Sequence, residues 1–224
     1  MRITTKLTLI ISCLLIVLFM TLAWTSYRHD QALALQETVD KARTIARQIV
    51  EIREYLSSVV RVEQVEQNTG LTPQVAATRI ALRLTQDSPY YVRQVSLRYR
   101  NPQNQPDAYE RETLQQFKGA QLKERFQVVG DGDNKALRYL LPMVADQSCL
   151  TCHGSFEQAP RFVQQRFPKG HPSYNYQAGE LIGAISVSVP LSTLQQTILN
   201  NMRRELLLEG VIVLLLVVVT GWLI

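Results

Sequence analysis

Two long apolar runs stand near the ends of the chain, and most of the charged positions lie between them. Leu7 to Tyr27 contains no charged residue, and residues 206–224 are interrupted only by Glu209. At a helical rise of about 1.5 Å per residue, either run is long enough to cross the hydrocarbon core of a bilayer. The pattern therefore predicts two transmembrane helices, 7–27 and 206–224.

Basic residues favour a cytoplasmic location for the N-terminus, residues 1–6. Arg2 and Lys6 precede the first apolar run, and cationic flanks tend to remain on the cytoplasmic side. Arg203 and Arg204 lie on the wrong side for this rule at the second run. A cleaved signal peptide is the alternative for the first run, but no clear Ala-x-Ala cleavage site follows it. We expect a protein of the bacterial inner membrane.

The segment between the runs, residues 28–190, begins with a long helix predicted over 28–67. No Pro or Gly occurs from His29 to Gln67, and apolar residues recur at steps of three and four at Leu35, Val39, Ala42, Ala46, Ile49, Ile52, Leu56 and Val59. Such a stripe can be a dimer seam, the face that packs on the helix's own domain, or both. On the first interpretation, a homodimer forms through Val39, Ala46, Ile49 and Leu56.

The rest of this segment switches between helix and strand patterns. Thr72-Pro73 and Asp107 are helix start signals, and alternating apolar and polar residues mark strands. The predicted elements are a helix over 73–84, a strand over 94–100, a helix over 108–118, a hairpin of 126–129 and 136–144 about a 130–134 turn, and a strand over 181–189. Pro190 then starts a connecting helix over 191–205. The order predicts an α+β domain with a PAS-like antiparallel sheet and flanking helices.

The candidate chemistry is concentrated in Cys149-Leu150-Thr151-Cys152-His153, because Cys-x-x-Cys-His is the spacing that attaches a c-type haem. Cys149 and Cys152 can form thioethers to the two vinyl groups, and His153 can serve as the proximal iron ligand. The motif occurs once, so we predict one covalent haem c. Haem c is attached outside the bacterial cytoplasm, which agrees with a periplasmic location for residues 28–190.

Zinc binding and thiol redox chemistry are the alternatives for the motif. Structural zinc sites take four Cys or His ligands, and only His171 is available in addition to the motif itself. A thioredoxin-like thiol pair begins a helix in a βαβ unit, whereas this motif follows a strand-like run and precedes Gly154. The third cysteine, Cys13, lies in the first apolar run, so the chain has no disulfide framework.

The residues around the motif resemble a known family. The resemblance rests on Asn101-Pro102, Asn104, Pro106-Asp107, Glu110, Tyr139, Pro142, Gly154, Gly179-Glu180, Gly183 to Val187 and Pro190. These are similar to the single-haem c-type, PAS-like periplasmic sensor domain, formerly a domain of unknown function. That domain commonly precedes HAMP linkers and histidine kinase, diguanylate cyclase or chemoreceptor modules. The resemblance covers residues 28–190 and implies sensing, with a cytoplasmic signalling module or a redox partner.

The sequence leaves the distal iron ligand open. In a family member with a described iron centre that ligand is a cysteine on the helix before the sheet, and residues 28–67 contain none. His171 and Met143 are the candidates here, and an open or water-bound position is the third option. Further residues that can line a haem pocket are Tyr139, Pro142, Gly154, Phe156, Phe162, Tyr174 and Tyr176, and those that can pair with haem propionates are Arg98, Arg138 and Arg161.

Two function classes remain. A sensor would respond to redox state or a diatomic gas by changing iron ligation and biasing the helices that enter the membrane. A membrane-tethered electron carrier is the alternative, but paired spans joined to unbroken helices favour the sensor. Nothing near the motif supplies an acid, base and nucleophile set, so we expect no enzyme. The net charge of +5 is not concentrated in a basic stretch, so we expect no nucleic-acid binding.

Overall fold

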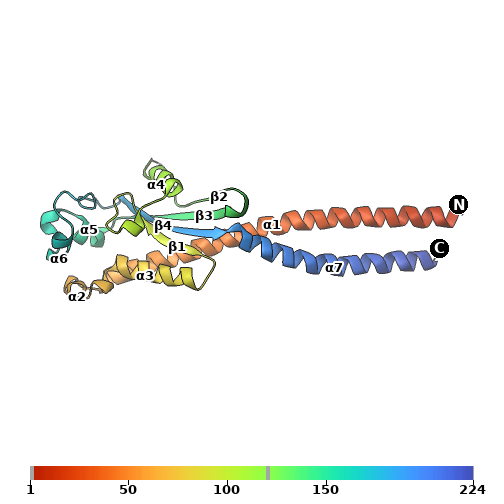
Figure 1. Cartoon of the computed structure of the whole chain (residues 1–224), viewed down its shortest axis with the longest axis horizontal. Helices are drawn as coiled ribbons and strands as arrows, with labels where there is room; N and C mark the ends of the chain where they lie inside the picture. The colour runs from red at the N-terminus through yellow and green to blue at the C-terminus, as the bar shows by residue number, and fades with distance from the viewer. Residues whose placement is uncertain (1–2, 120–121, 224) are drawn as a thin grey trace. The chain divides into compact units, whose positions relative to one another are not determined.

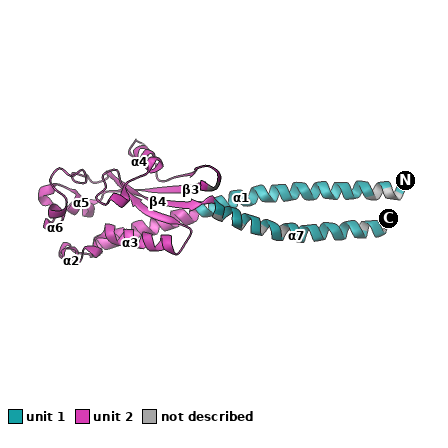
Figure 2. Cartoon of the chain, in the orientation of Figure 1, with its two compact units in different colours: residues 1–38, 192–224 teal, residues 39–191 magenta. Residues whose placement is uncertain are grey.

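The computed structural model describes residues 3–119 and 122–223, which form two compact units (Figure 2). We call residues 1–38 with 192–224 the helical unit and residues 39–191 the sheet unit. The helices are α1 (Ile3–Val59), α2 (Val62–Gln67), α3 (Pro73–Gln86), α4 (Ala108–Gly119), α5 (Gln147–His153), α6 (Arg161–Arg166) and α7 (Leu191–Leu223), and the strands are β1 (Tyr91–Val95), β2 (Arg125–Val129), β3 (Ala136–Val144) and β4 (Leu181–Pro190).

The helical unit contains the first part of α1 and most of α7. Among the described residues one helix, Leu9–Val59 within α1, is long and apolar enough to cross a membrane. A signal sequence near the N-terminus has the same length and composition. The helix overlaps the first predicted span, 7–27. The second predicted span, 206–224, falls within α7 and stays a prediction, and both Arg2 and Ile224 lie outside the described residues.

The sheet unit is built on four antiparallel strands in the order β1-β4-β3-β2. The register places Val92 opposite Val187 and Leu141 opposite Ile185, so these apolar side chains share one face of the sheet. Figure 1 shows α4 on one side of the sheet and α1 and α3 on the other. The predicted α+β architecture, an antiparallel sheet with flanking helices, is confirmed.

The face covered by α4 combines an apolar cluster with a buried carboxylate. The cluster consists of Val95, Leu114, Phe117, Leu140 and Ala184. Beside it, Glu110 is 1% exposed and forms ion pairs with Arg93 and Arg138. Asp107 Oδ1 accepts from Glu110 N, and Glu110 Oε2 accepts from Asp107 N, each at 2.9 Å. Asp107 is therefore the N-cap that the sequence predicts, within a reciprocal capping box.

The apolar stripe of α1 packs on the sheet unit's own core. Val39, Ala42, Ala46 and Ile49 are all at most 4% exposed in the single chain. The structure supports the packed face for these four positions, whereas Leu56, which the predicted seam also contains, is only partly buried. Whether the protein forms a homodimer through other residues stays a prediction.

Two predicted boundaries are corrected by local hydrogen bonding. The strand placed at 94–100 is β1, which ends at Val95, because Ser96 Oγ donates to Ile182 O and Ser96 N donates to Asn104 O. These bonds turn the chain away from the sheet. The helix predicted over 28–67 is interrupted after Val59, where Arg61 has an extended backbone and its N–H donates to Gln64 Oε1 at the start of α2.

Candidate functional site

The Cys-x-x-Cys-His motif lies on the short helix α5, which follows β3. Asp146 caps this helix, since its Oδ1 accepts from Cys149 N at 3.0 Å. Positions three and four apart on a helix share a face, so Cys149, Cys152 and His153 are brought onto one side of α5. The helix ends at Gly154, where a Cβ would stand 2.6 Å from Leu150 O. The glycine predicted for a haem pocket therefore has a steric role in closing α5.

His153 is held as a neutral imidazole with one ring nitrogen engaged. Its Nδ1 lies 2.9 Å from Ser173 O, and its ring meets the ring of Tyr176 edge-on at a centroid separation of 5.8 Å. Burial lowers the pKa of His153 to about 4, and the positive charges of Arg100 and Arg53 act in the same direction. A carbonyl can only accept, so Nδ1 carries the proton and Nε2 keeps its lone pair. This is the tautomer that an iron-ligating histidine requires.

A cavity of about 600 Å³ adjoins α5. Its wall is formed by α3, by the segment that follows β1, by α6 and by the motif residues Cys152 and His153, with Met143, Phe162 and Tyr176. This volume lies within the range of about 300–1,000 Å³ that is usual for ligand sites. The described lining residues include four arginines, Arg79, Arg98, Arg100 and Arg166, and no Asp or Glu. The cavity is therefore suited to an anionic ligand with a large apolar body.

Two of these arginines are held by the protein framework. Arg98 donates to Glu180 Oε1 at 2.8 Å and to the carbonyls of Pro172 and Tyr174, and its guanidinium lies 3.6 Å from the ring centroid of Tyr176. Arg100 donates to Cys152 O and to Ser173 Oγ, both at 2.7 Å. These bonds tie the segment after β1 to the loop that holds His153.

The other two arginines of the cavity wall are not held by the described protein framework. Arg79 belongs to α3 and Arg166 to the end of α6, and both are exposed. Neither makes a hydrogen bond or an ion pair with the residues that the structure describes. Their guanidinium groups are thus available to carboxylates at the solvent edge of the cavity.

A fifth arginine reaches the motif from α1. Arg53 is 7% exposed, its Nη2 lies 2.9 Å from Cys149 Sγ, and its Nη1 lies 4.0 Å from Met143 Sδ. Burial raises the pKa of the Cys149 thiol, and the charge of Arg53 opposes this shift. Nothing in the sequence distinguishes Arg53, because an arginine within an amphipathic helix gives no sign of burial.

The two distal-ligand candidates lie in different places. Met143 lines the cavity together with His153. His171 is not among the described lining residues, and its Nδ1 lies 2.8 Å from Ser173 Oγ. Both histidines therefore contact Ser173, His153 through the carbonyl oxygen and His171 through the hydroxyl. The structure therefore brings Met143 to the cavity and does not bring His171 there.

The predicted pocket aromatics divide into two groups. Tyr176 and Phe162 line the cavity. Tyr174 and Phe156 pack with Ala159 and Val163 in a small core, against which Phe162 also packs. Tyr139 is fully buried, and its hydroxyl donates to Glu124 Oε2 at 2.8 Å. Pro142 pairs with Ala184 within the sheet, and neither Tyr139 nor Pro142 is among the described lining residues.

Of the three predicted propionate partners, only Arg98 reaches the cavity, where Glu180 already neutralises it. Arg138 bridges Asp107 and Glu110 on the face covered by α4. Arg161 is exposed at the start of α6 and is not among the described lining residues. The unengaged cations Arg79 and Arg166 are in better positions. Only the tertiary contacts show which arginines are unengaged, because the sequence offers nothing that separates Arg79 and Arg166 from the three predicted partners.

The comparisons with known proteins extend over the same part of the chain. The sequence model of the Tll0287-like family (Tll0287) matches residues 29–190. The chain belongs to this family. Among solved structures, the crystal structure of the cyanobacterial haem protein Tll0287 is similar, with 26% sequence identity and a TM-score of 0.58 over 69% of this chain and 95% of that chain. A comparison with curated proteins gave no match.

The residues of this Tll0287-like chain fit a haem group by the chemistry of their donors. Two thiols and an imidazole with a free Nε2 stand together on α5, beside a cavity whose described lining is cationic at its edge and holds aromatic side chains. The zinc alternative gains no support, since the described residues contain no group of three or more His, Cys, Asp or Glu side chains that could hold a metal ion.

Proposed function

We propose that this protein binds one haem c covalently and senses redox state or a diatomic gas in the periplasm. The observation that carries the proposal is the bond between His153 Nδ1 and Ser173 O, which leaves Nε2 as the ligand atom of a buried, neutral imidazole. The Tll0287-like family assignment and the similarity to a haem protein support the same cofactor.

The residues of the site would hold the haem by covalent bonds, by iron ligation and by ion pairs. Cys149 and Cys152 would form the two thioethers, and His153 would be the proximal ligand. Arg79 and Arg166 would bind the two carboxylates at the solvent edge. Bound in this way, haem iron supplies one-electron redox chemistry and a sixth coordination position for a small ligand.

The chain's own residues tune this site. Ser173 orients the imidazole through its carbonyl, and the surrounding burial keeps His153 unprotonated at neutral pH. Met143 is the described side chain best placed to act as a weak distal ligand or to cover an open position. We expect no enzymatic reaction from this set, because no acid, base and nucleophile are grouped around it.

The signalling part of the proposal rests on α1. One helix contains both the candidate membrane span that begins at Leu9 and the segment around Arg53 that reaches the motif. A shift of the motif could therefore be carried along a continuous helix. We infer a PAS-like sensor domain held in the inner membrane by 7–27 and 206–224, with a cytoplasmic signalling module as its partner.

Electron transfer is the second candidate function. Cys149 and Cys152 are only partly buried, and Thr151 between them is exposed. A haem attached there would present one edge to solvent, as a carrier needs. A carrier does not require its redox change to alter α1, and this difference separates the two functions.

The test is the visible spectrum of the full chain, produced with c-type maturation machinery and reduced with dithionite, before and after addition of carbon monoxide. We expect haem that stays with the polypeptide in denaturing electrophoresis, and its loss in Cys149→Ala/Cys152→Ala. A carbon monoxide shift would favour gas sensing. An unchanged spectrum would leave redox sensing or electron transfer, and absence of covalent haem would overturn the proposal.

A further inference from the structure

Arg53 is a buried cation without a buried anion. It is 7% exposed, and among the described residues its side-chain hydrogen bonds are to the sulfur atoms of Cys149 and Met143. Among the residues that the structure describes, no Asp or Glu forms an ion pair with it. Asp146, which caps α5, accepts hydrogen bonds from Cys149 N and Ser148 Oγ.

Burial of the Arg53 guanidinium costs free energy of desolvation unless an anion supplies the counter-charge. A guanidinium remains protonated in proteins, and sulfur is a weak hydrogen-bond acceptor. Buried charges are ordinarily paired, because their desolvation is otherwise uncompensated. The buried carboxylate of Glu110 follows that rule in the same unit, since it pairs with Arg93 and Arg138. The position of Arg53 therefore points to an anion that binds beside Cys149.

We propose that Arg53 is the fixed counter-charge of the bound haem, and that it couples the oxidation state of the iron to α1. This inference rests on the proposed function. Cys149 Sγ would be bonded to the edge of the macrocycle, so Arg53 would stand against that edge. Its charge raises the reduction potential of the iron, because it stabilises the more negative reduced state.

The coupling follows from the same charge. When an external one-electron donor reduces Fe³⁺ to Fe²⁺, the site gains one negative charge and no bond forms or breaks. The attraction between the site and Arg53 becomes stronger, and reduction therefore favours the position of α1 in which Arg53 reaches Cys149. Linkage makes the effect reciprocal, so a change in α1 that withdraws Arg53 makes the iron harder to reduce. Arg100, a second cation near the motif, donates to the neutral acceptors Cys152 O and Ser173 Oγ and lacks this connection to α1.

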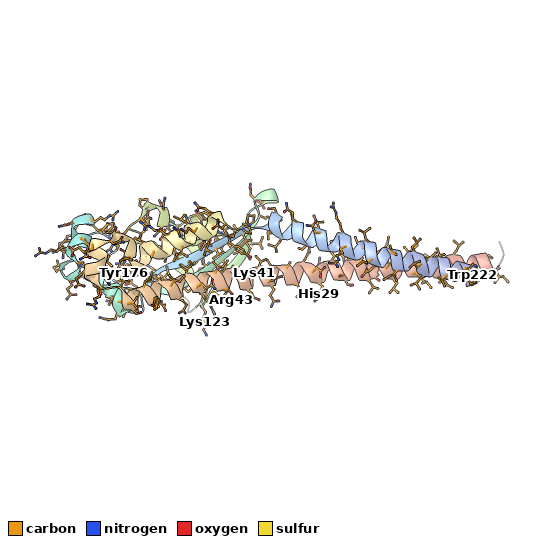
Figure 3. All side chains as sticks on the ribbon, turned by 90° about the horizontal axis from the view of Figure 1, so that it is seen from below. His29, Lys41, Arg43, Lys123, Tyr176 and Trp222 are labelled. Atoms are coloured by element: carbon orange, nitrogen blue, oxygen red, sulfur yellow. The ribbon has the colours of Figure 1, made fainter. Side chains whose placement is uncertain are left out.

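The first test is a redox titration of the covalent haem in the full chain. Arg53→Met removes the charge and keeps a long side chain, whereas Arg53→Lys keeps the charge. The matched control is Arg47→Gln, because Arg47 is an exposed arginine on the same helix. Its neighbour Arg43 is well separated along the sheet unit from Tyr176, which lines the cavity (Figure 3). We expect a lower midpoint potential for Arg53→Met, a smaller change for Arg53→Lys and none for Arg47→Gln.

The second test is amide hydrogen exchange over residues 46–59 in the oxidised and the reduced protein. We expect slower exchange after reduction in the wild type and in Arg53→Lys, and equal rates in Arg53→Met. If Arg53→Met does not fold, Arg53→Gln replaces it in both tests. If the neutral variants of Arg53 carry covalent haem with the same midpoint potential as Arg47→Gln, this inference is overturned and the proposed function is not. Absence of haem from the wild type would overturn the proposed function and this inference with it.

Discussion

His153 Nδ1 lies 2.9 Å from the carbonyl oxygen of Ser173, a residue that is twenty positions away in the chain. Two neighbouring bonds strengthen this relationship, since Tyr176 N donates to His153 O at 3.0 Å and Asn175 N donates to Gly154 O at 2.8 Å. The loop thus runs along the end of α5 and fixes both the ring and its backbone. A ligand histidine held in this way cannot rotate freely, which keeps Nε2 directed at one place.

His153→Ala removes the proposed proximal ligand. We expect loss of a stable haem spectrum while the protein still inserts in the membrane, measured by visible spectroscopy and immunoblotting of the same membranes. His171→Ala is the matched control, because His171 lies beside Ser173 and outside the described cavity lining. A normal spectrum in His153→Ala would refute this histidine as the ligand, and a changed one in His171→Ala would restore His171 as a candidate.

Asn175 is the described non-glycine residue with a positive φ, 59°. Asparagine tolerates this region, but a β-branched residue does not. Asn175→Val should destabilise the loop by about 1–2 kcal/mol and broaden the haem spectrum by loosening Ser173. Asn175→Gly is the control and should leave both the urea midpoint and the spectrum near their wild-type values. Equal behaviour of the two variants would mean that this loop does not hold the imidazole.

Arg79→Gln/Arg166→Gln removes the two unengaged cations at the edge of the cavity. Haem content should be unchanged, because the thioethers hold the group, but the midpoint potential should fall. Both arginines are exposed, so the effect should shrink at high salt, in contrast to any effect of the buried Arg53. The control pair is Arg83→Gln/Arg161→Gln, which changes the same net charge away from the described cavity lining. A potential equal to that of the control pair would count against carboxylate binding there.

Glu110→Gln leaves two arginines without their buried counter-charge. Because Glu110 is 1% exposed and pairs with both Arg93 and Arg138, we expect a loss of about 3–5 kcal/mol in the free energy of unfolding. Urea unfolding followed by circular dichroism measures this loss. Glu112→Gln, an exposed change on the same helix, should cost far less. Similar midpoints for the two variants would show that the network contributes little.

Glu124 should make the stability of the sheet unit depend on pH. The hydrogen bond from Arg43 lowers the pKa of Glu124 below its ordinary value of 4.5, against the opposing effect of burial, and the Tyr139 hydroxyl assists. A lowered folded-state pKa means that the unfolded chain binds the proton more tightly. The contribution is complete above pH 4.5 and is lost as the pH falls through the folded-state pKa.

Urea unfolding at a series of pH values from neutral to acidic tests this dependence. The slope at low pH should be smaller in Glu124→Gln than in the wild type. Glu54→Gln, at an exposed position on α1, should keep the wild-type slope. An unchanged slope in Glu124→Gln would show that the Arg43 pair does not stabilise the fold.

The sequence by itself determined the parts of this protein that depend on local chemistry. The Cys149 to His153 spacing, the capping of α4 by Asp107, the start of α3 at Pro73 and the strands on either side of the 130–134 turn all follow from neighbours within a few residues. Periodicity also gave the apolar stripe of α1, because one face of a helix must be buried somewhere.

Only the tertiary structure decided where the stripe is buried and which polar groups meet. Val39 and Ala46 pack on the sheet unit, a choice that the helix period cannot make. Ser173 and Arg53 are respectively twenty and about a hundred residues from the motif, and neither has a local signal. Hydrogen bonds and buried charges between distant segments form only when the sheet brings those segments together. The conformation of His153 and the environment of Cys149 are therefore properties of the fold.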